Sequence, residues 1–253
     1  MKLASRLDRI EPFYVMECAK AAVEIARSPQ CDPAQGGSPM IFLNIGEPDF
    51  TAPPLVQEAA DRAMRAGRTQ YTQATGLPEL RERISGWYRT RFGLDIPARR
   101  IVVTAGASAA LQLACLALVD RGDEVLLPDP SYPCNRHFVS AADGVPVLLP
   151  ASAEERYQLS AHSVRSAWSE RTRGVLLASP SNPTGTSIDP DEMGRIVAAV
   201  RERGGFTMVD EIYLGLSFDE RFGHSALMHE IAGDHSVISI NSFSILLHPG
   251  LVH

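Results

Sequence analysis

The sequence predicts an α/β protein built on a mostly parallel, doubly wound sheet with helices on both faces. Two observations predict this fold: short apolar runs rich in Val, Ile and Leu, and stretches of helical periodicity between many of them. Strand and helix in alternation give parallel strands, because each helix returns the chain to the same edge of the sheet. With 253 residues, 45% of them hydrophobic and 21% charged, the chain can bury a sizeable core.

The elements are expected in a simple order along the chain. An amphipathic helix within residues 1–40 leads into the loop SPQCDPAQGGSP, which ends an N-terminal arm. Helical spacing follows in SAALQLACLALVDRG and in PDEMGRIVAAVRERGG, each of which ends in glycine. The expected strands are IVVTAG (101–106), EVLLP (124–128), VPVLLP (145–150), GVLLAS (174–179), FTMVDE (206–211) and SVISI (236–240).

Composition narrows the function classes. The 24 basic and 30 acidic residues give a net charge of −6, and no basic run is dense enough for a nucleic-acid groove, so small metabolites are the expected partners. The N-terminus has no apolar block of the length that a signal peptide or membrane span needs, so we expect a cytoplasmic protein that binds no membrane.

Cysteines and histidines give no sign of a metal site. The gaps of five and six residues between His224, His229 and His235 do not place them on one helical face, so we expect surface histidines and no metal. The cysteines form no CxxC pair and are expected to be reduced and structural. They are Cys18, Cys31, Cys115 and Cys134.

The first candidate site follows the apolar run at residues 101–105. Gly106, Ala107 and Ser108 lead from it into a helix, and small residues at a helix N-terminus leave backbone N–H groups open to an anion. Ser108 adds a hydroxyl, which suits a phosphate. The alternative is a Gly-Ala-Ser turn that serves only close packing.

Two further candidates follow later strands. Asn182 lies in SPSNPTGT (179–186), where prolines and a glycine fix a loop at the carboxyl edge of the sheet; a well-capped loop into a helix near Asp189 is the alternative. Asp210 ends a strand in VDEIY, and Tyr213 follows it. A buried carboxylate needs a cation or several donors, although Asp210 could also cap a helix.

Taken together, these sites resemble the fold type I aminotransferases of classes I and II, which use pyridoxal 5′-phosphate. The resemblance runs from about Arg9 to Ser244. It rests on motifs in family order: NIGEPDF (44–50), YTQATGLPELRERI (71–84), VTAGASAAL (103–111), GDEVLLPDPSYP (122–133), SPSNPTGT, MVDEIYLGLSF (208–218) and NSFS (241–244).

The resemblance implies a set of cofactor contacts. Gly106, Ala107 and Ser108 match the phosphate cradle, and Tyr132 matches the aromatic ring that stacks on the pyridine. Asp210 matches the partner of the pyridinium nitrogen, which helps the ring accept electrons from the substrate. The two donors to the phenolic oxygen are matched by Asn182 and Tyr213.

Further matches concern the substrate, the phosphate and a second subunit. Gly46 matches a backbone group that touches the substrate carboxylate, and Ser242 matches a further phosphate-binding serine. Tyr71 matches a tyrosine that reaches the phosphate of the neighbouring subunit, which implies a homodimer. The implied reaction, part of amino acid metabolism, moves an amino group between an amino acid and a 2-oxo acid.

The family's Schiff-base lysine has no counterpart in this chain. Ile245 stands at its position, and the lysines of the sequence are Lys2 and Lys20, both in the arm. We therefore expect residues 1–50 to form the arm with part of a small domain, residues 51–253 to form a truncated cofactor domain, and the C-terminal small domain to be absent. Catalytic activity of the chain is expected to be lost.

The tail that follows NSFS has a possible origin in a frameshift. Codons can be chosen for residues 245–251 that, read one base later and completed by the first base of Val252, give Tyr-Phe-Cys-Ile-Pro-Gly-Trp, which resembles the family's segment after the lysine. A chance tail is the alternative. Resequencing the gene around codon 245 separates the two.

Two alternatives stay open at this point, and a third is not expected. A lyase or synthase of the same fold shares these motifs, and a frameshifted fragment could have no function. An aminotransferase-like sensor domain of a transcription regulator carries a winged helix before these motifs, whereas here they begin by residue 44, so we do not expect one. The substrate amino acid is not readable from these motifs.

Overall fold

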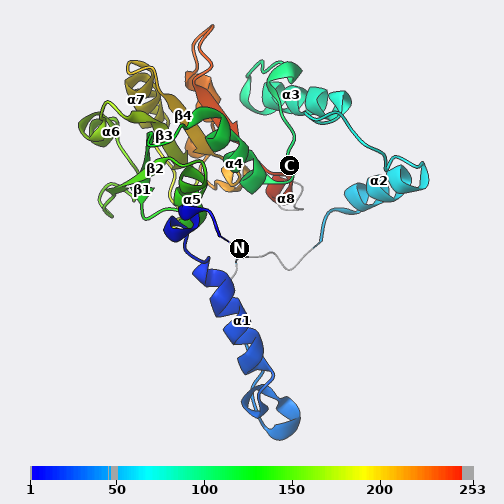
Figure 1. The fold of residues 1–253 in the computed structure, drawn as a ribbon. Helices are drawn as coiled ribbons and strands as arrows, with labels where there is room; N and C mark the ends of the chain where they lie inside the picture. The colour runs from blue at the N-terminus through cyan, green and yellow to red at the C-terminus, as the bar shows by residue number, and fades with distance from the viewer. Residues whose placement is uncertain (1, 45, 47–50, 247–253) are drawn as a thin grey trace. The chain divides into compact units, whose positions relative to one another are not determined.

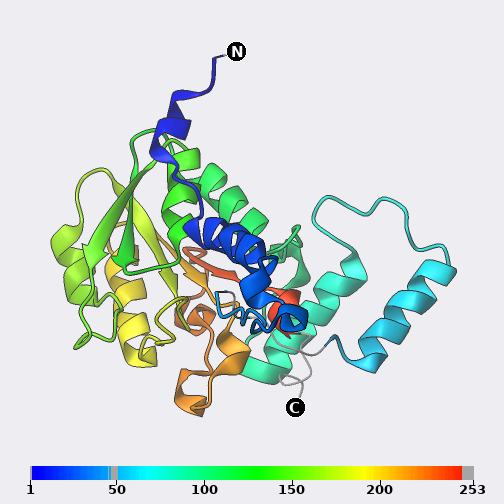
Figure 2. The same ribbon diagram turned by 90° about the horizontal axis from the view of Figure 1, so that it is seen from below.

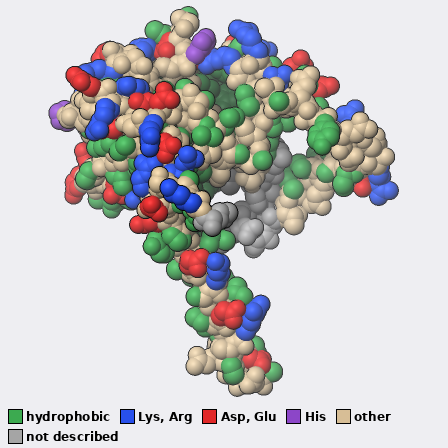
Figure 3. All heavy atoms as spheres, in the orientation of Figure 1, with side chains coloured by type: hydrophobic (Ala, Val, Ile, Leu, Met, Phe, Trp, Pro, Cys, Tyr) green, Lys and Arg blue, Asp and Glu red, His purple; other side chains and the backbone are tan. Residues whose placement is uncertain are grey.

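The computed structural model describes residues 2–44, 46 and 51–246, in two compact units. The arm unit, Met1–Thr51, contains helix α1 (Tyr14–Ala26), the helix expected within residues 1–40. Its short 3-10 helices are η1 (Ser5–Arg9), η2 (Pro29–Cys31) and η3 (Pro33–Gln35). No residue of α1 is buried, and hydrophobic and charged side chains are mixed along it (Figure 3).

The sheet unit, Ala52–His253, is built on five strands that all run parallel (Figure 1). The strands lie in the order β2-β1-β3-β4-β5. The predicted parallel α/β sheet is therefore confirmed. The strand bounds are β1 (Glu124–Asp129), β2 (Val145–Pro150), β3 (Thr172–Ala178), β4 (Phe206–Asp210) and β5 (Val237–Ile240).

Helices cover both faces of this sheet (Figure 2). Successive strand residues point to opposite sides, so each face carries apolar side chains that the helices bury. Leu126 packs in the core with α3 (Pro78–Phe92), α6 (Ala161–Ala167) and α7 (Pro190–Arg201). Its neighbours Val125 and Leu127 pack in the core of the other face. That face is covered by α4 (Ala107–Leu118) and α5 (Pro133–Ala141).

The remaining elements of the sheet unit are short or exposed. Helix α2 (Pro54–Arg65) has no buried residue. Four short 3-10 helices lie in connections, and α8 (Phe243–Leu246) follows β5. The 3-10 helices are η4 (Ala98–Arg100), η5 (Leu214–Leu216), η6 (Glu220–Phe222) and η7 (Ala226–His229). None of the described helices is long and apolar enough to cross a membrane.

The run IVVTAG, expected as a strand, is not one. Residues 101–104 belong to no helix or strand and pair with no strand of the described sheet. Alternating apolar residues indicate partial burial, whereas a strand also needs a neighbour with which to exchange backbone hydrogen bonds. Here the N–H of Val103 donates to the carbonyl of Thr75 (3.1 Å), and the Val103 side chain packs against Gly76.

Two smaller expectations also need correction. His229 is not a surface histidine: it is half-buried beside Gly194, where an added Cβ would lie 2.9 Å from its Nδ1, and burial lowers its pKa. The cysteines are free as expected, but only part of the set is buried: Cys115 lies in the core, whereas Cys18 is exposed.

Candidate functional site

A pocket of ≈ 120 Å³ lies at the carboxyl edge of the sheet. A single water occupies about 10–15 Å³ on this scale, so the pocket has room for part of a small organic molecule. Its lining comes from the start of α4, the residue before α5, the loop after β3 and the end of β4. The residues are Ala107, Ser108, Leu111, Tyr132, Ala178, Pro180, Asn182, Asp210, Ile212 and Tyr213.

Gly106 shapes the first wall of this pocket. Its φ of 85° and ψ of 171° belong to a backbone region that is essentially restricted to glycine. A Cβ at this position would meet no atom within 4 Å, so the space beside it is open. No side chain caps α4, and within the described chain the first backbone N–H groups of this helix, at Ala107 and Ser108, donate to no acceptor. This is the free helix N-terminus that the sequence predicts.

Asp210 ends β4 at the opposite wall and is 7% exposed. Its Oδ1 accepts the N–H of Ile212 (3.2 Å), which is the local capping contact weighed as the alternative. Within the described residues its Oδ2 accepts no hydrogen bond. Burial therefore raises the pKa of Asp210 to about 6, and the single backbone donor offsets only part of that effect.

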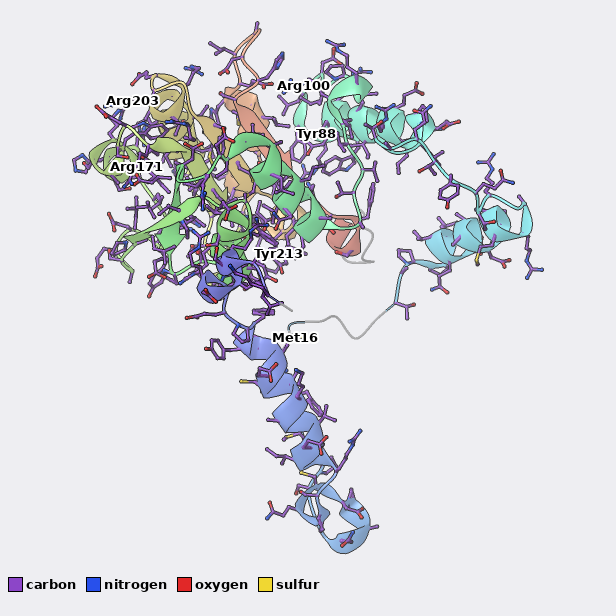
Figure 4. All side chains as sticks on the ribbon, in the orientation of Figure 1. Met16, Tyr88, Arg100, Arg171, Arg203 and Tyr213 are labelled. Atoms are coloured by element: carbon purple, nitrogen blue, oxygen red, sulfur yellow. The ribbon has the colours of Figure 1, made fainter. Side chains whose placement is uncertain are left out.

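Further polar side chains complete the wall around Asp210. Asn182, in the loop after β3, and Tyr213, which is labelled in Figure 4, make no side-chain hydrogen bond with any described residue. Tyr132 precedes α5 and is half-buried, and burial raises the pKa of its phenol. Asn182 and Tyr213 thus place two donors without partners among the described residues beside the buried Asp210, and this arrangement indicates a binding site.

Glu211, next to Asp210, is a contrasting case that the sequence prediction missed. It is 1% exposed and accepts hydrogen bonds from Ser225 Oγ (2.9 Å), Ser239 Oγ (2.5 Å) and the N–H of Ala226 (2.6 Å). Burial nevertheless raises its pKa to about 7. These contacts hold the end of β4 to β5 and to the start of η7.

The structure brings together only part of the predicted site. Tyr71 is fully exposed, and it does not line the pocket. Ser242 does not line it either, and its Oγ instead shares a hydrogen bond with Ser244 Oγ (2.7 Å). Gly46 belongs to the arm unit. Most of the NIGEPDF motif (residues 45 and 47–50) and the tail at 247–253 lie outside the described residues.

Apolar residues form the part of the pocket that the sequence did not reveal. Leu111 lies one turn into α4, and Ala178 and Pro180 flank the end of β3. Ile212 follows Asp210. Their position after strand ends was the available signal, but an aliphatic side chain carries no chemical signature that separates a binding surface from the core.

The chemistry of this lining fits pyridoxal phosphate. An uncapped helix N-terminus with Ser108 suits a phosphate dianion. The free oxygen of Asp210 suits a protonated ring nitrogen, since a cation there would lower the pKa that burial raises. Asn182 and Tyr213 supply donors for an oxyanion, and Leu111 and Ile212 supply apolar surface for a ring.

Comparison with known proteins gives a consistent result. The family model described as aminotransferase class I and II matches residues 38–244. A probable aspartate/prephenate aminotransferase of Aquifex aeolicus is 36% identical over 211 residues, which cover 83% of this chain and 52% of that protein. A putative aminotransferase of Bacillus subtilis is 38% identical over 184 residues, or 72% of this chain and 48% of its own length.

Solved structures agree with this result. A crystal structure of an aminotransferase from Mycobacterium tuberculosis has a TM-score of 0.86 at 32% identity, over 98% of this chain and 60% of that one. The aspartate aminotransferase of Rhizobium meliloti has a TM-score of 0.85 at 30% identity, over 95% and 58%. The chain thus spans about half the length of the curated relatives it matches.

Proposed function

The chain belongs to the aminotransferase class I and II family, and we propose that its pocket binds pyridoxal 5′-phosphate for amino-group transfer between an amino acid and a 2-oxo acid. The observation that carries this proposal is Asp210: a carboxylate buried at a strand end, with one local donor, a free oxygen and a raised pKa. Bound pyridoxal phosphate supplies an electron sink that stabilises negative charge on the substrate α-carbon.

The residues of the pocket have separate tasks in this proposal. The N–H groups that begin α4, together with Ser108, hold the phosphate. Asp210 would hold a proton on the ring nitrogen, which would keep the ring electron-poor. Asn182 and Tyr213 donate to the phenolic oxygen, and Tyr132 packs against the ring.

Covalent attachment is not expected in this chain. Position 245, in α8, is isoleucine, and Lys2 and Lys20 both belong to the arm unit. The Lys20 amine is exposed and paired with Glu17 (2.7 Å). A lysine amine both anchors the cofactor aldehyde and exchanges it with the substrate amine, so we propose weak, non-covalent binding and at most trace turnover.

Assembly and location are part of the same proposal. Helix α1 exposes Tyr14, Met16, Val23 and Ile25 within its unit, and exposed apolar groups of this kind favour association. We propose that the folded chain is a homodimer, and that the protein is cytoplasmic. Light scattering of the full chain tests the assembly, and a stable monomer would contradict it.

The experiment that tests cofactor binding is a titration of the full chain with pyridoxal phosphate, followed by absorbance and by quenching of protein fluorescence. We expect saturable binding that pyridoxal, which lacks the phosphate, reproduces only weakly. Borohydride treatment and intact-mass analysis should then show no stoichiometric adduct. Absence of saturable binding, a stoichiometric adduct on Lys2 or Lys20, or robust turnover of any amino acid would each overturn part of the proposal.

A further inference from the structure

The loop that carries Asn182 is closed by its own backbone, and its first residue is tied to the sheet by the Ser179 N–H, which donates to the Asp210 carbonyl (3.0 Å). The Ser181 N–H donates to the Thr186 carbonyl (2.9 Å), and the Gly185 N–H donates to the Ser181 carbonyl (2.8 Å). Both bonds lie inside the loop, so they fix its shape and not its position. Asn182 itself makes no side-chain hydrogen bond with a described residue, so its place at the pocket depends on how this loop is held.

Gln158, which comes from the connection between β2 and α6, ties the loop to the end of β3. Its Nε2 donates to the carbonyl of Ala178 (3.2 Å) and to the carbonyl of Thr186 (2.9 Å), and it also contacts Thr186 Oγ1 (3.3 Å). Ala178 is the last residue of β3 and lines the pocket, whereas Thr186 is on the far side of the turn. This amide therefore joins the two ends of the loop from outside it, in addition to the Ile188 N–H, which donates to Ser179 Oγ (3.0 Å).

The orientation of this amide follows from its partners. The carbonyls of Ala178 and Thr186 accept hydrogen bonds only, so the NH₂ group and not the oxygen of Gln158 must face them. Gln158 is 6% exposed, and within the described residues its buried Oε1 has no hydrogen-bond partner. The amide thus directs its donors to the two carbonyls that flank the loop and leaves its own oxygen unpaired, so its hydrogen bonds serve the loop.

The backbone before Gln158 also indicates that the position of this side chain is specifically held. Arg156 and Tyr157 have φ values of 57° and 56°, in the left-handed region that residues other than glycine rarely adopt. Two such residues in succession are strained, and strained backbone persists only where the surrounding structure holds it. Here the N–H of Tyr157 donates to the carbonyl of Ser152 (2.8 Å), and the chain turns so that Gln158 enters the interior.

We propose that Gln158 is a positioning residue that holds the loop at residues 179–186, and through it the amide of Asn182, against the cofactor pocket. The role assigned to Asn182 rests on the proposed function, whereas the bracing of the loop by Gln158 does not. Because Gln158 does not line the pocket, it acts on the cofactor only through the loop.

The first test measures the loop without any cofactor. Hydrogen exchange followed by mass spectrometry is compared between the full chain, Gln158→Met, Gln158→Glu and a control, Ser85→Ala. Ser85 also donates a buried side-chain hydrogen bond to a carbonyl, that of Ile96 (2.6 Å), but it does not line the pocket. Methionine fills the space of Gln158 and donates nothing.

In Gln158→Met we expect the N–H groups of Ser181, Gly185 and Ile188 to exchange about tenfold faster, because losing about one net hydrogen bond makes local opening that much easier. In Gln158→Glu the buried, protonated acid keeps one donor, so the loop should exchange at a rate between those of the parent chain and Gln158→Met. This variant also provides the test if the methionine variant does not fold. Ser85→Ala should accelerate exchange only near α3. Unchanged loop exchange in a folded Gln158 variant would overturn the proposal.

The second test connects the loop to the pocket. Affinity for pyridoxal phosphate is measured for Gln158→Met, Asn182→Ala and the double variant. We expect Gln158→Met to weaken binding about fivefold in the parent chain and to have almost no further effect when Asn182 is alanine, because residues that act through one another are not additive. Additive losses would refute action through Asn182. No binding by the parent chain would count against the proposed function, while the exchange result would still decide the bracing role.

Discussion

Two carboxylates at opposite edges of the same sheet differ in how they are satisfied. Glu124 begins β1 and Asp210 ends β4, and each is 7% exposed. Glu124 accepts hydrogen bonds from Ser169, Thr172 and Arg171, and the Ser169 bond is the main reason that its pKa is lowered. Asp210 has one backbone donor, and burial raises its pKa to about 6. Figure 4 labels Arg171 at the amino edge.

This difference in hydrogen bonding indicates that Glu124 stabilises the fold, whereas Asp210 is available to a ligand. At the amino edge every oxygen of Glu124 has a partner inside the chain, so this carboxylate contributes to stability. At the carboxyl edge Asp210 is left half-satisfied beside free donors, which costs stability unless another molecule completes the site. Substitutions at the two edges should therefore move stability and affinity independently.

The largest expected effect is on stability, at the amino edge. Glu124→Ala should lower the free energy of unfolding by about 2 kcal/mol, because it removes a buried, charged acceptor that Ser169, Thr172 and Arg171 share. Affinity for pyridoxal phosphate should not change, since Glu124 does not line the pocket. Chemical denaturation and cofactor titration measure the two quantities. A loss of affinity in the folded variant would contradict the claim that the amino edge affects stability and not cofactor binding.

The pH dependence of stability sharpens the comparison. The folded pKa values of Asp210 and Glu211, about 6 and 7, lie above their ordinary values of 3.8 and 4.5, so their stabilising contribution is complete below those ordinary values and is lost as pH rises through 6 and 7. Between pH 6 and pH 8 the cofactor-free protein should lose about 2 kcal/mol of unfolding free energy.

The control for this measurement is Glu211→Gln, which should remove most of that slope. Glu124 has the opposite sign: its pKa is lowered, so its contribution is present above 4.5 and is lost only in acid, below this window. Urea denaturation at a series of pH values measures the slope for the parent chain and for Glu211→Gln. A stability that rises from pH 6 to pH 8 would contradict the account of the carboxyl edge.

The smallest expected effect concerns the phosphate contact. Ser108→Ala should weaken binding of pyridoxal phosphate only about threefold to fivefold, because the backbone N–H groups of α4 remain. Binding of pyridoxal, which has no phosphate, should be unaffected. Titrations with the two ligands provide the comparison, and an equal loss for both would place the phosphate elsewhere.

Sequence patterns predict this sheet well where burial and pairing coincide. VPVLLP matches β2 at both ends, and FTMVDE ends one residue beyond β4. The run at 101–106 failed because apolar alternation reports burial, whereas pairing depends on a neighbour that local sequence does not specify. The glycines that follow α4 and α7 in the sequence located the ends of these helices to within a few residues.

The polar half of the candidate pocket was predictable from the sequence. Ala107, Ser108, Asn182, Asp210 and Tyr213 follow strands or begin a helix, and parallel strands bring such positions to one edge. The apolar lining and the bracing contact of Gln158 were not predictable, because they depend on which connections pack together across long stretches of sequence. Tyr71 and Ser242, predicted from family resemblance, do not line the pocket of a single chain.

The most direct test of the role of Asp210 compares Asp210→Asn with the parent chain in unfolding free energy and in affinity for pyridoxal phosphate. Asparagine keeps the contact with the Ile212 N–H but cannot be ionised, so it should raise the unfolding free energy at pH 8 by about 2 kcal/mol. The same substitution should weaken binding of pyridoxal phosphate by about 30-fold or more, since the ring nitrogen loses its charged partner. An Asp210→Asn variant that is less stable than the parent, or that binds the cofactor equally well, would contradict the central claim that this carboxylate is kept unsatisfied for a ligand.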